Sequence, residues 1–237
     1  MKIIESKDNS TYKKLVKLKS GDASAGLFLA EGSDLFEEAK KAAAIKLKIY
    51  PLSAIEEVDA DDETIFIKDG LYRELSTYKS LPKIITLCQK RYASDYGKRV
   101  IYLDGIQDPG NCGTIIRTAL SFGYSSVVLS KDSVSLYNNK VVQSSKGALF
   151  NLSVGREDLE VLKSEGYHLY LTTLDGKDER NFQTLEKPFC LVFGNEGTGI
   201  RKSHLALGEH LKIEMSGIDS LNVAVASGIF MYRFQRS

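Results

Sequence analysis

Hydrophobic and polar positions follow two different patterns along the second half of the chain. Short runs rich in Val, Ile, Leu and Phe predict buried strands, and the amphipathic segments between them predict helices. The expected strands cover residues 100–103, 126–129, 149–154, 167–172, 189–193 and 211–215. The expected helices cover residues 113–122, 139–146 and 158–165, followed by a short helix after residue 200 and a last helix that ends near residue 231. This order is typical of an α/β fold with a mostly parallel, doubly wound sheet.

The first part of the chain is expected to form a small α/β unit of its own. Helices are expected at residues 12–18, 33–44 and 71–78, and strands at residues 27–30, 47–52 and 64–68. Residues 81–98 are rich in charged and small side chains, and we interpret them as the end of this unit followed by a linker. We therefore expect two domains, residues 1–95 and residues 96–237.

The composition is typical of a globular protein. With 237 residues and 43% hydrophobic content, the chain can bury a substantial core. It lacks the run of ~18 apolar residues that a membrane helix requires, and its first residues lack the apolar core of a signal peptide. We expect a cytoplasmic protein without a membrane partner.

The three cysteines predict neither a disulfide framework nor a zinc site. Cys88, Cys112 and Cys190 are odd in number and lie far apart in the sequence, unlike the closely spaced ligands of zinc motifs. Buried free thiols are the expected state, and no bound metal is expected.

The overall charge gives no argument for nucleic acid binding. The 32 basic and 31 acidic side chains leave a net charge of +1, so any contact with a polyanion has to come from a local patch. The best candidate is one short segment that holds Lys13, Lys14, Lys17 and Lys19. A solvated helix face is the ordinary explanation for such a run and stays open as the alternative.

A glycine-rich turn follows the expected strand at residues 189–193. Residues 191–200 read LVFGNEGTGI, and Gly194, Gly197 and Gly199 allow the backbone to turn sharply and to approach a ligand closely. Ligands of open α/β sheets collect at such strand ends. The spacing matches neither a dinucleotide-binding G-x-G-x-x-G turn nor a P-loop. For this loop taken alone, a turn without a ligand is an equal alternative.

A second polar turn, at residues 216–222, precedes the last helix. Residues 213–231 read IEMSGIDSLNVAVASGIFM, and apolar side chains cover most of the circumference of the expected helix. Such a helix needs burial on several sides. Ser220 is the expected N-cap, and Asn222 is either a functional amide or simply a second polar group at a helix start.

Three motifs taken together resemble the signature of a known family. DPGNCGTIIRTA at residues 108–119, with the stretches at residues 191–200 and 213–231, resembles in order and separation the motifs of the SpoU-type RNA 2′-O-ribose methyltransferases of the SPOUT superfamily. The lysine-rich segment and the following GLFLAEG resemble, more loosely, the N-terminal RNA substrate-binding domain of these enzymes. That domain is similar to a small ribosomal protein fold.

The resemblance implies a cofactor, a fold and partners. It implies S-adenosylmethionine as the cofactor, a C-terminal SPOUT-like domain with a trefoil knot, and a homodimer that builds its site between two subunits. The implied reaction is 2′-O-methylation of a ribose in structured RNA. The two-domain layout favours 23S ribosomal RNA as the substrate. A transfer RNA substrate and a non-catalytic RNA-binding protein on the same fold are the alternatives.

The resemblance also assigns roles to individual residues. The implied cofactor-binding residues are Gly194, Asn195, Glu196, Gly197, Ile213, Met215 and Leu221. The implied catalytic residues are Arg117, Asn111, Glu196, Ser220 and Asn222. The expected RNA contacts are Lys13, Lys14, Lys17 and Arg117. A guanidinium is effectively never deprotonated, so we interpret Arg117 as a phosphate clamp that stabilises the developing alkoxide, with a role as base left open.

Three positions depart from the family's pattern. Glu214 stands where many relatives have proline, Ala224 where serine is common, and Gln143 where arginine is expected. All the implied catalytic residues are nevertheless present, and a purely RNA-binding protein would have no use for them. The departures therefore bear on substrate contacts, above all near Gln143, rather than on activity.

Overall fold

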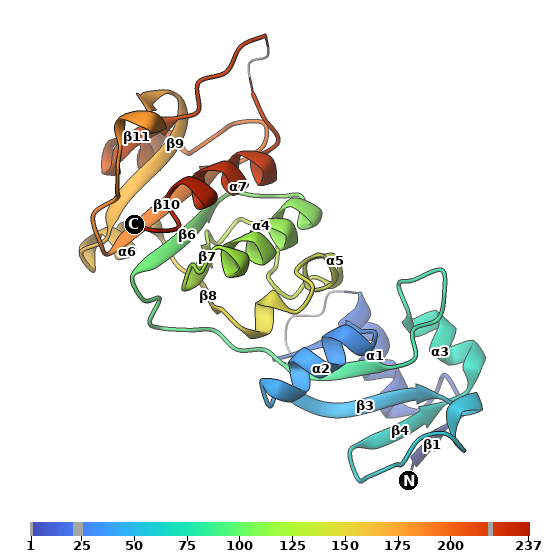
Figure 1. The fold of residues 1–237 in the computed structure, drawn as a ribbon. Coiled ribbons are helices and arrows are strands. Elements are labelled where there is room, and N and C mark those ends of the chain that lie inside the picture. The colour runs from blue at the N-terminus through green and yellow to red at the C-terminus, as the bar shows by residue number, and fades with distance from the viewer. Residues whose placement is uncertain (1, 21–25, 218–219) are drawn as a thin grey trace. The chain divides into compact units, whose positions relative to one another are not determined.

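The computed structural model describes residues 2–20, 26–217 and 220–237 (Figure 1). The chain forms two compact units. The first combines Met1–Arg91 with Tyr137–Phe150, and the second combines Tyr92–Leu136 with Asn151–Ser237. The expected division at residue 95 left residues 137–150 in the second domain. They belong to the first unit because Phe28 packs its ring against both Tyr137 and Phe150.

The first unit is built on a five-stranded sheet in the order β1-β4-β3-β5-β2. Its strands are β1 (Lys2–Ile4), β2 (Leu27–Glu31), β3 (Ile45–Pro51), β4 (Thr64–Ile67) and β5 (Ile85–Gln89). Its helices are α1 (Ser10–Lys19), α2 (Ser33–Lys41), α3 (Asp69–Leu75) and α5 (Asn139–Ser144). The β1, β4 and β3 strands run parallel to one another, and β5 pairs antiparallel with both β3 and β2.

Three of these elements differ from the sequence-based expectation. The strand β5 lies in the segment interpreted as a linker, and its pairing with both β3 and β2 shows that it completes the sheet between them. The strand β1 is three residues long, too short to give a periodic signal. The helix α2 ends at Lys41 rather than near residue 44, because Ala43 adopts a positive φ of 48° that breaks the helix.

The helix α1 is amphipathic in the way the lysine spacing indicated. Tyr12 and Leu15 are buried in the core of the unit, and the Tyr12 hydroxyl donates to the Leu71 carbonyl at 3.1 Å. The side chain of Asn9 caps the helix by accepting from the N–H groups of Thr11 and Tyr12. The helix is therefore held firmly, with its lysines on the outer face.

The second unit is built on a six-stranded, wholly parallel sheet in the order β11-β9-β10-β6-β7-β8. Its strands are β6 (Arg99–Asp104), β7 (Ser126–Leu129), β8 (Ser153–Arg156), β9 (His168–Asp178), β10 (Phe189–Gly194) and β11 (Glu209–Lys212). Its helices are α4 (Pro109–Ser121), α6 (Leu159–Ser164) and α7 (Val223–Arg233). The expected parallel α/β sheet is confirmed.

Alternate residues of the central strands pack on opposite faces of this sheet. On one face, Val100 and Tyr102 of β6 belong to a core that includes Leu159 and Leu162 of α6. On the other, Phe193 of β10 packs against Phe230 of α7, with ring centroids 6.0 Å apart. The apolar runs that marked these strands therefore reflect burial on both faces.

Two helix starts that matter for the site differ from expectation. The helix α4 begins at Pro109 rather than residue 113, with Asp108 as N-cap accepting from the Asn111 N–H at 2.7 Å. Proline suits this first position because its missing N–H has no partner there. The N-cap of α7 is Asn222 rather than Ser220. Within the expected turn at residues 216–222, residues 218 and 219 lie outside the described residues.

The helices α4 and α7 lie side by side and run in the same direction (Figure 1). Asn111 contacts Asn222 at their N-terminal ends, and the rings of Phe122 and Tyr232 pack at 5.7 Å near their C-terminal ends. This parallel arrangement brings both helix N-termini to the same edge of the sheet.

The three cysteines are buried and unpaired, as the sequence indicated. Burial raises the pKa of the Cys112 thiol to about 12, so this group stays protonated and is a poor nucleophile at neutral pH. In the part of the chain that the structure describes, no helix is long and apolar enough to cross a membrane.

Candidate cofactor pocket and polar cluster

A cavity of ≈ 730 Å³ lies in the second unit, beside the carboxyl end of β10 and the middle of β9. It is lined by Thr172, Thr173, Leu174, Asp175, Phe193, Gly194, Asn195, Glu196, Gly197, Thr198, Gly199, Ile200, Leu205, Ile213, Met215, Ser220, Leu221, Asn222, Val223, Ala226 and Phe230. Strand ends of a parallel sheet are where open α/β proteins bind their ligands.

The loop after β10 forms one wall of this cavity and is held by its own hydrogen bonds. The Asn195 side chain donates to the Gly105 carbonyl at 2.7 Å and accepts from the N–H groups of Gly197 and Thr198. Backbone bonds in both directions between Asn195 and Gly199 close the loop. Gly199 has a φ of +71°, a conformation that glycine adopts without strain.

Gly194 is required by close backbone packing. A Cβ at this position would lie 2.2 Å from the carbonyl carbon of Gly199 and 2.2 Å from the nitrogen of Ile200. Any larger residue would therefore force the loop to open. Gly197 differs, because a Cβ there would lie 3.6 Å from Asn195 Oδ1, an ordinary contact.

The chemical character of the cavity lining limits what it can bind. Most lining side chains are apolar, including Phe193, Ile213 and Leu221. Among the described residues that line it, Asp175 and Glu196 carry the only ionisable groups, and both are acidic. The lining suits an apolar or cationic ligand and offers no cation to hold a phosphate.

A polar cluster joins one side of the cavity to the start of α4. The Asn111 amide donates to Glu196 Oε1 at 3.1 Å, and the Asn222 amide donates to Asn111 Oδ1 at 3.1 Å. The Glu196 carboxylate also accepts, at 3.4 Å, from the backbone N–H groups of Gln107 and Asp108. The positive end of α4 favours a carboxylate at this position. Asn222 in turn caps α7 through the Ala224 and Val225 N–H groups.

Arg117 stands apart from this cluster. It is exposed on α4, and its side chain makes no hydrogen bond or ion pair with any residue the structure describes. Six residues separate it from Asn111, which corresponds to a rotation of about 240° around a helix with 3.6 residues per turn. Within one chain, the two side chains therefore point in different directions.

The structure thus groups most of the implied site residues. All seven implied cofactor-binding residues line the cavity, together with Ser220 and Asn222. Asn111 joins through Glu196. The three lysines lie on α1 in the first unit, where Lys13 pairs with Asp8 at 2.9 Å and Lys14 and Lys17 are exposed.

Sequence reasoning missed the cavity wall formed by Thr172, Thr173, Leu174 and Asp175. These residues belong to β9, which was expected to end at residue 172 but continues to Asp178. The signal that could have identified them is their position directly after an apolar run in a parallel sheet. The lining residues Phe193, Ile200, Leu205, Val223, Ala226 and Phe230 were also missed, because they are apolar and look like ordinary core.

Comparisons with known proteins agree with this geometry. A family model described as the SpoU rRNA Methylase family matches residues 98–232. The 23S rRNA (guanosine(2553)-2′-O)-methyltransferase RlmP of Bacillus subtilis (strain 168) is 31% identical over 250 residues, which cover 99% of this chain and 100% of that protein.

Solved structures agree as well. The AdoMet-bound rRNA methyltransferase from Sinorhizobium meliloti has a TM-score of 0.87 at 26% identity, covering 99% of this chain and 97% of that one. The SpoU methyltransferase AviRb from Streptomyces viridochromogenes, in complex with the cofactor AdoMet, has a TM-score of 0.83 at 23% identity and shares the fold over 96% of this chain and 97% of that one. The chain therefore belongs to the SpoU rRNA methylase family, the S-adenosylmethionine-dependent RNA 2′-O-ribose methyltransferases.

Proposed function

We propose that this enzyme methylates the 2′-oxygen of a ribose in 23S ribosomal RNA. The observation that carries the proposal is the full-length relation to RlmP, whose name gives 23S rRNA as its substrate. Transfer RNA is the second candidate. A solved structure described as giving insights into the 2-OH methylation of C/U34 on tRNA has a TM-score of 0.52 at 25% identity. It covers only 59% of this chain, which favours the ribosomal RNA proposal. We also propose that the enzyme acts in the cytoplasm, where this substrate would be found.

The residues of the cavity fit S-adenosylmethionine. The cofactor supplies a methyl group on a positively charged sulfonium. The acidic groups of Asp175 and Glu196 favour that charge, and the apolar lining offers a surface for the adenine. Backbone groups of residues 194–199 provide the hydrogen bonds that orient it. These are the roles we assign to Gly194, Asn195, Gly197, Ile213, Met215 and Leu221.

The polar cluster positions the RNA. Asn111, Glu196 and Asn222 hold one another in fixed geometry at the rim of the cavity, so we assign them, with Ser220, to orienting the ribose. Arg117 acts as a phosphate clamp that also stabilises charge developing on the 2′-oxygen. A group that acts in this way must reach the cluster, and Arg117 of the same chain points elsewhere.

We propose that a homodimer resolves this separation. The outer face of α7 exposes apolar side chains, with Val225 53%, Ile229 38% and Tyr232 64% exposed, and Leu120 of α4 is 38% exposed. An apolar patch on two packed helices marks an interaction surface, and a two-fold axis would pair it with its own copy. Arg117 lies three residues before Leu120, on the same exposed side of α4. The dimer would thus bring Arg117 of each protomer toward the cluster of the other.

We assign RNA selection to the first unit and the reaction to the second. Lys14 and Lys17 are exposed on α1, and neither makes a side-chain ion pair with any described residue. Free cations on a firmly held helix suit the contact with phosphates that gives RNA affinity. We also propose that the C-terminal segment is knotted, as the family resemblance implies. The insertion of β10 between β6 and β9 is compatible with such a path.

The substrate proposal is tested by mapping ribose methylation in cells. A strain that lacks the gene is expected to lose one 2′-O-methyl group from its 23S ribosomal RNA and to regain it with the wild-type gene. The same map is made for transfer RNA. Loss of a modification from transfer RNA, with ribosomal RNA unchanged, would replace the proposed substrate by the second candidate.

Reversing the charge of Lys14 and Lys17 together is expected to weaken RNA binding roughly tenfold and to reduce its salt dependence, because two phosphate contacts are lost. Affinity for S-adenosylmethionine should not change, since these lysines lie in the other unit. Reversing Lys40 and Lys41 together, both exposed on α2, is the matched control because it changes the charge by the same amount. RNA affinity that falls equally in the control would show a general charge effect and contradict a specific role for α1.

Arg117→Lys is expected to slow single-turnover methylation roughly 100-fold while cofactor affinity is retained. Lysine keeps the positive charge but lacks the planar fork that holds a phosphate with two bonds. The rate is measured with saturating RNA and cofactor, and the affinity by calorimetry. A near-normal rate would reduce Arg117 to a point charge or a structural residue.

Gly194→Ala is expected to abolish measurable cofactor binding, because its Cβ would overlap the backbone of Gly199 and Ile200. Gly70→Ala, in α3 of the first unit, is the control: a Cβ there would meet no atom within 4 Å, so this variant should bind the cofactor normally. Calorimetry on both variants makes the comparison. Equal affinity of Gly194→Ala and wild type would remove this loop from the cofactor site.

Ile229→Glu is expected to convert the dimer to monomers at micromolar concentration, because the charge would be buried without a partner. Methylation should fall with it if the site needs two protomers. Light scattering gives the mass, and Ile3→Glu, a similarly exposed apolar residue of the first unit, is the control. A wild-type protein that is monomeric in this assay contradicts the proposal directly.

A further inference from the structure

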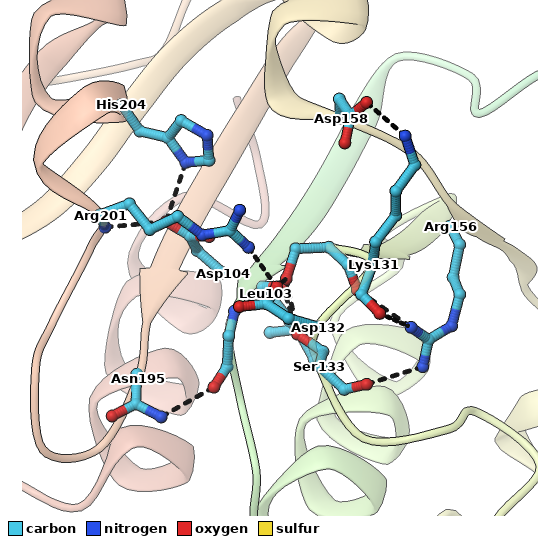
Figure 2. Close-up of polar contacts among 12 residues, drawn as sticks. Leu103, Asp104, Lys131, Asp132, Ser133, Arg156, Asp158, Asn195, Arg201 and His204 are labelled. Atoms are coloured by element: carbon cyan, nitrogen blue, oxygen red, sulfur yellow. Dashed lines mark hydrogen bonds and ion pairs between the residues drawn. The ribbon is translucent and has the colours of Figure 1, made fainter.

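A second polar network lies next to residues 194–200, which we call the cofactor loop after the function proposed above. Its members do not line the cavity. Its centre is Asp104, the last residue of β6, whose side chain is completely buried (Figure 2). A buried carboxylate is costly unless nearby groups compensate its charge. The groups that compensate the charge of Asp104 are therefore held against the end of β6.

Three groups from residues 201–204 compensate the Asp104 carboxylate. The Arg201 backbone N–H donates to Oδ2 at 3.0 Å, and Arg201 Nε lies 2.9 Å from Oδ1. Nδ1 of the buried His204 lies 2.9 Å from Oδ2. The segment directly after the cofactor loop is thereby fixed to the end of β6.

The guanidinium of Arg201 also reaches a second carboxylate. Its terminal nitrogen pairs with Oδ1 of Asp132, in the loop after β7 (Figure 2). Asp132 is oriented by Ser130, whose hydroxyl donates to the same oxygen at 2.7 Å. The Arg201 fork therefore spans the ends of two neighbouring strands, β6 and β7.

The loop that carries Asp132 is itself held by an arginine. Arg156 of β8 donates to four backbone carbonyls of this loop, those of Ser130, Lys131, Ser133 and Val134, at 2.6 to 3.2 Å. Figure 2 shows Arg156 beside Lys131 and Ser133. In addition, Gln107 Nε2 donates to the Asp132 carbonyl at 2.7 Å. These hydrogen bonds connect the loop after β7 to β8 and to the segment that follows β6, and so hold it in one conformation.

We propose that Arg201 is a positioning residue for the cofactor. It directly follows Ile200, which lines the cavity, and it fixes one end of the loop whose other end is fixed by Gly194 and Asn195. Anchoring both ends keeps the cavity wall in its binding shape before the cofactor arrives. The inference rests on the proposed assignment of residues 194–200 to the cofactor site.

The expected defect is in binding rather than in the bound reaction. Without the two contacts of the Arg201 guanidinium, only a fraction of the molecules would hold the loop in its binding-competent conformation. The apparent affinity for the cofactor is then the intrinsic affinity multiplied by that fraction. The Glu196 bonds to Asn111 and to the start of α4 do not involve Arg201. Once the cofactor is bound, the polar cluster should therefore retain its geometry.

Arg201→Lys in the full-length protein is the direct test. Lysine keeps the positive charge but cannot contact Asp104 and Asp132 at the same time with a planar guanidinium. Calorimetry is expected to show cofactor affinity reduced roughly tenfold, as when the competent fraction falls to about a tenth. The rate at saturating cofactor should stay within about threefold of wild type. In the absence of cofactor, hydrogen exchange of the amides in residues 195–200 should be faster.

Two further variants keep the test decisive. Asp132→Asn removes only the exposed partner of the fork, and is expected to give a smaller loss of affinity in the same direction. Arg180→Lys weakens the exposed pair with Asp178 and should change neither affinity nor exchange. Wild-type affinity in both Arg201→Lys and Asp132→Asn overturns the proposal. Reduced affinity with unchanged exchange also overturns it, since Arg201 would then act on the cofactor directly. Failure of wild type to bind the cofactor would instead refute the proposed cofactor site.

Discussion

The parallel pairing of β6 with β10 is the interaction on which the rest of the site depends. Its register places Gly194 beside Asp104, two residues from distant parts of the sequence. From that point one chain segment leads to the N-terminus of α4 and the other becomes the cofactor loop. Asn195 then bonds to Gly105, and Arg201 pairs with the buried Asp104. Because the Asp104 carboxylate is completely buried, leaving it without a partner would be costly, so the loop and the sheet edge are coupled.

The second constraint is the parallel packing of α7 on α4. It joins the two helix N-termini at the edge where β6 and β10 end, so that Asn222 meets Asn111 and Asn111 meets Glu196. The three motifs of the sequence are therefore one structure in space. The same packing turns Phe230 inward against Phe193 and leaves Val225 and Tyr232 outside. One helix thus both caps the pocket and supplies the proposed dimer surface.

Much of this arrangement could be predicted from the sequence. The apolar runs identified the central strands because those strands are buried on both faces. Residues of the second and third motifs line one cavity, and the first motif joins it through the bond from Asn111 to Glu196. The helix starts were less accurate: Asp108, counted only as a motif residue, caps α4, and Asn222 rather than the expected Ser220 caps α7. When one polar residue both caps a helix and belongs to a functional motif, the sequence alone does not separate the two roles.

Other features depend on contacts that no local pattern contains. Residues 137–150 join the first unit through the rings of Phe28 and Tyr137, a contact between distant segments. The Asp104–Arg201 pair could not be predicted from the sequence, because an aspartate at a strand end and an arginine in a loop are both common. The position of Arg117, away from Asn111, follows from helix geometry. Only the structure shows that the rest of the cluster forms without it, which is the basis of the proposed dimer.

The central claim is that this pocket transfers a methyl group from S-adenosylmethionine to a ribose oxygen of ribosomal RNA. It is tested most directly by incubating the purified protein with methyl-labelled cofactor and unmodified 23S ribosomal RNA, followed by complete alkaline hydrolysis. A 2′-O-methyl group blocks cleavage at its own phosphodiester, so the account predicts that the label appears in an alkali-resistant dinucleotide. Label in mononucleotides would show methylation of a base, and the absence of label with 23S ribosomal RNA would contradict the proposed substrate.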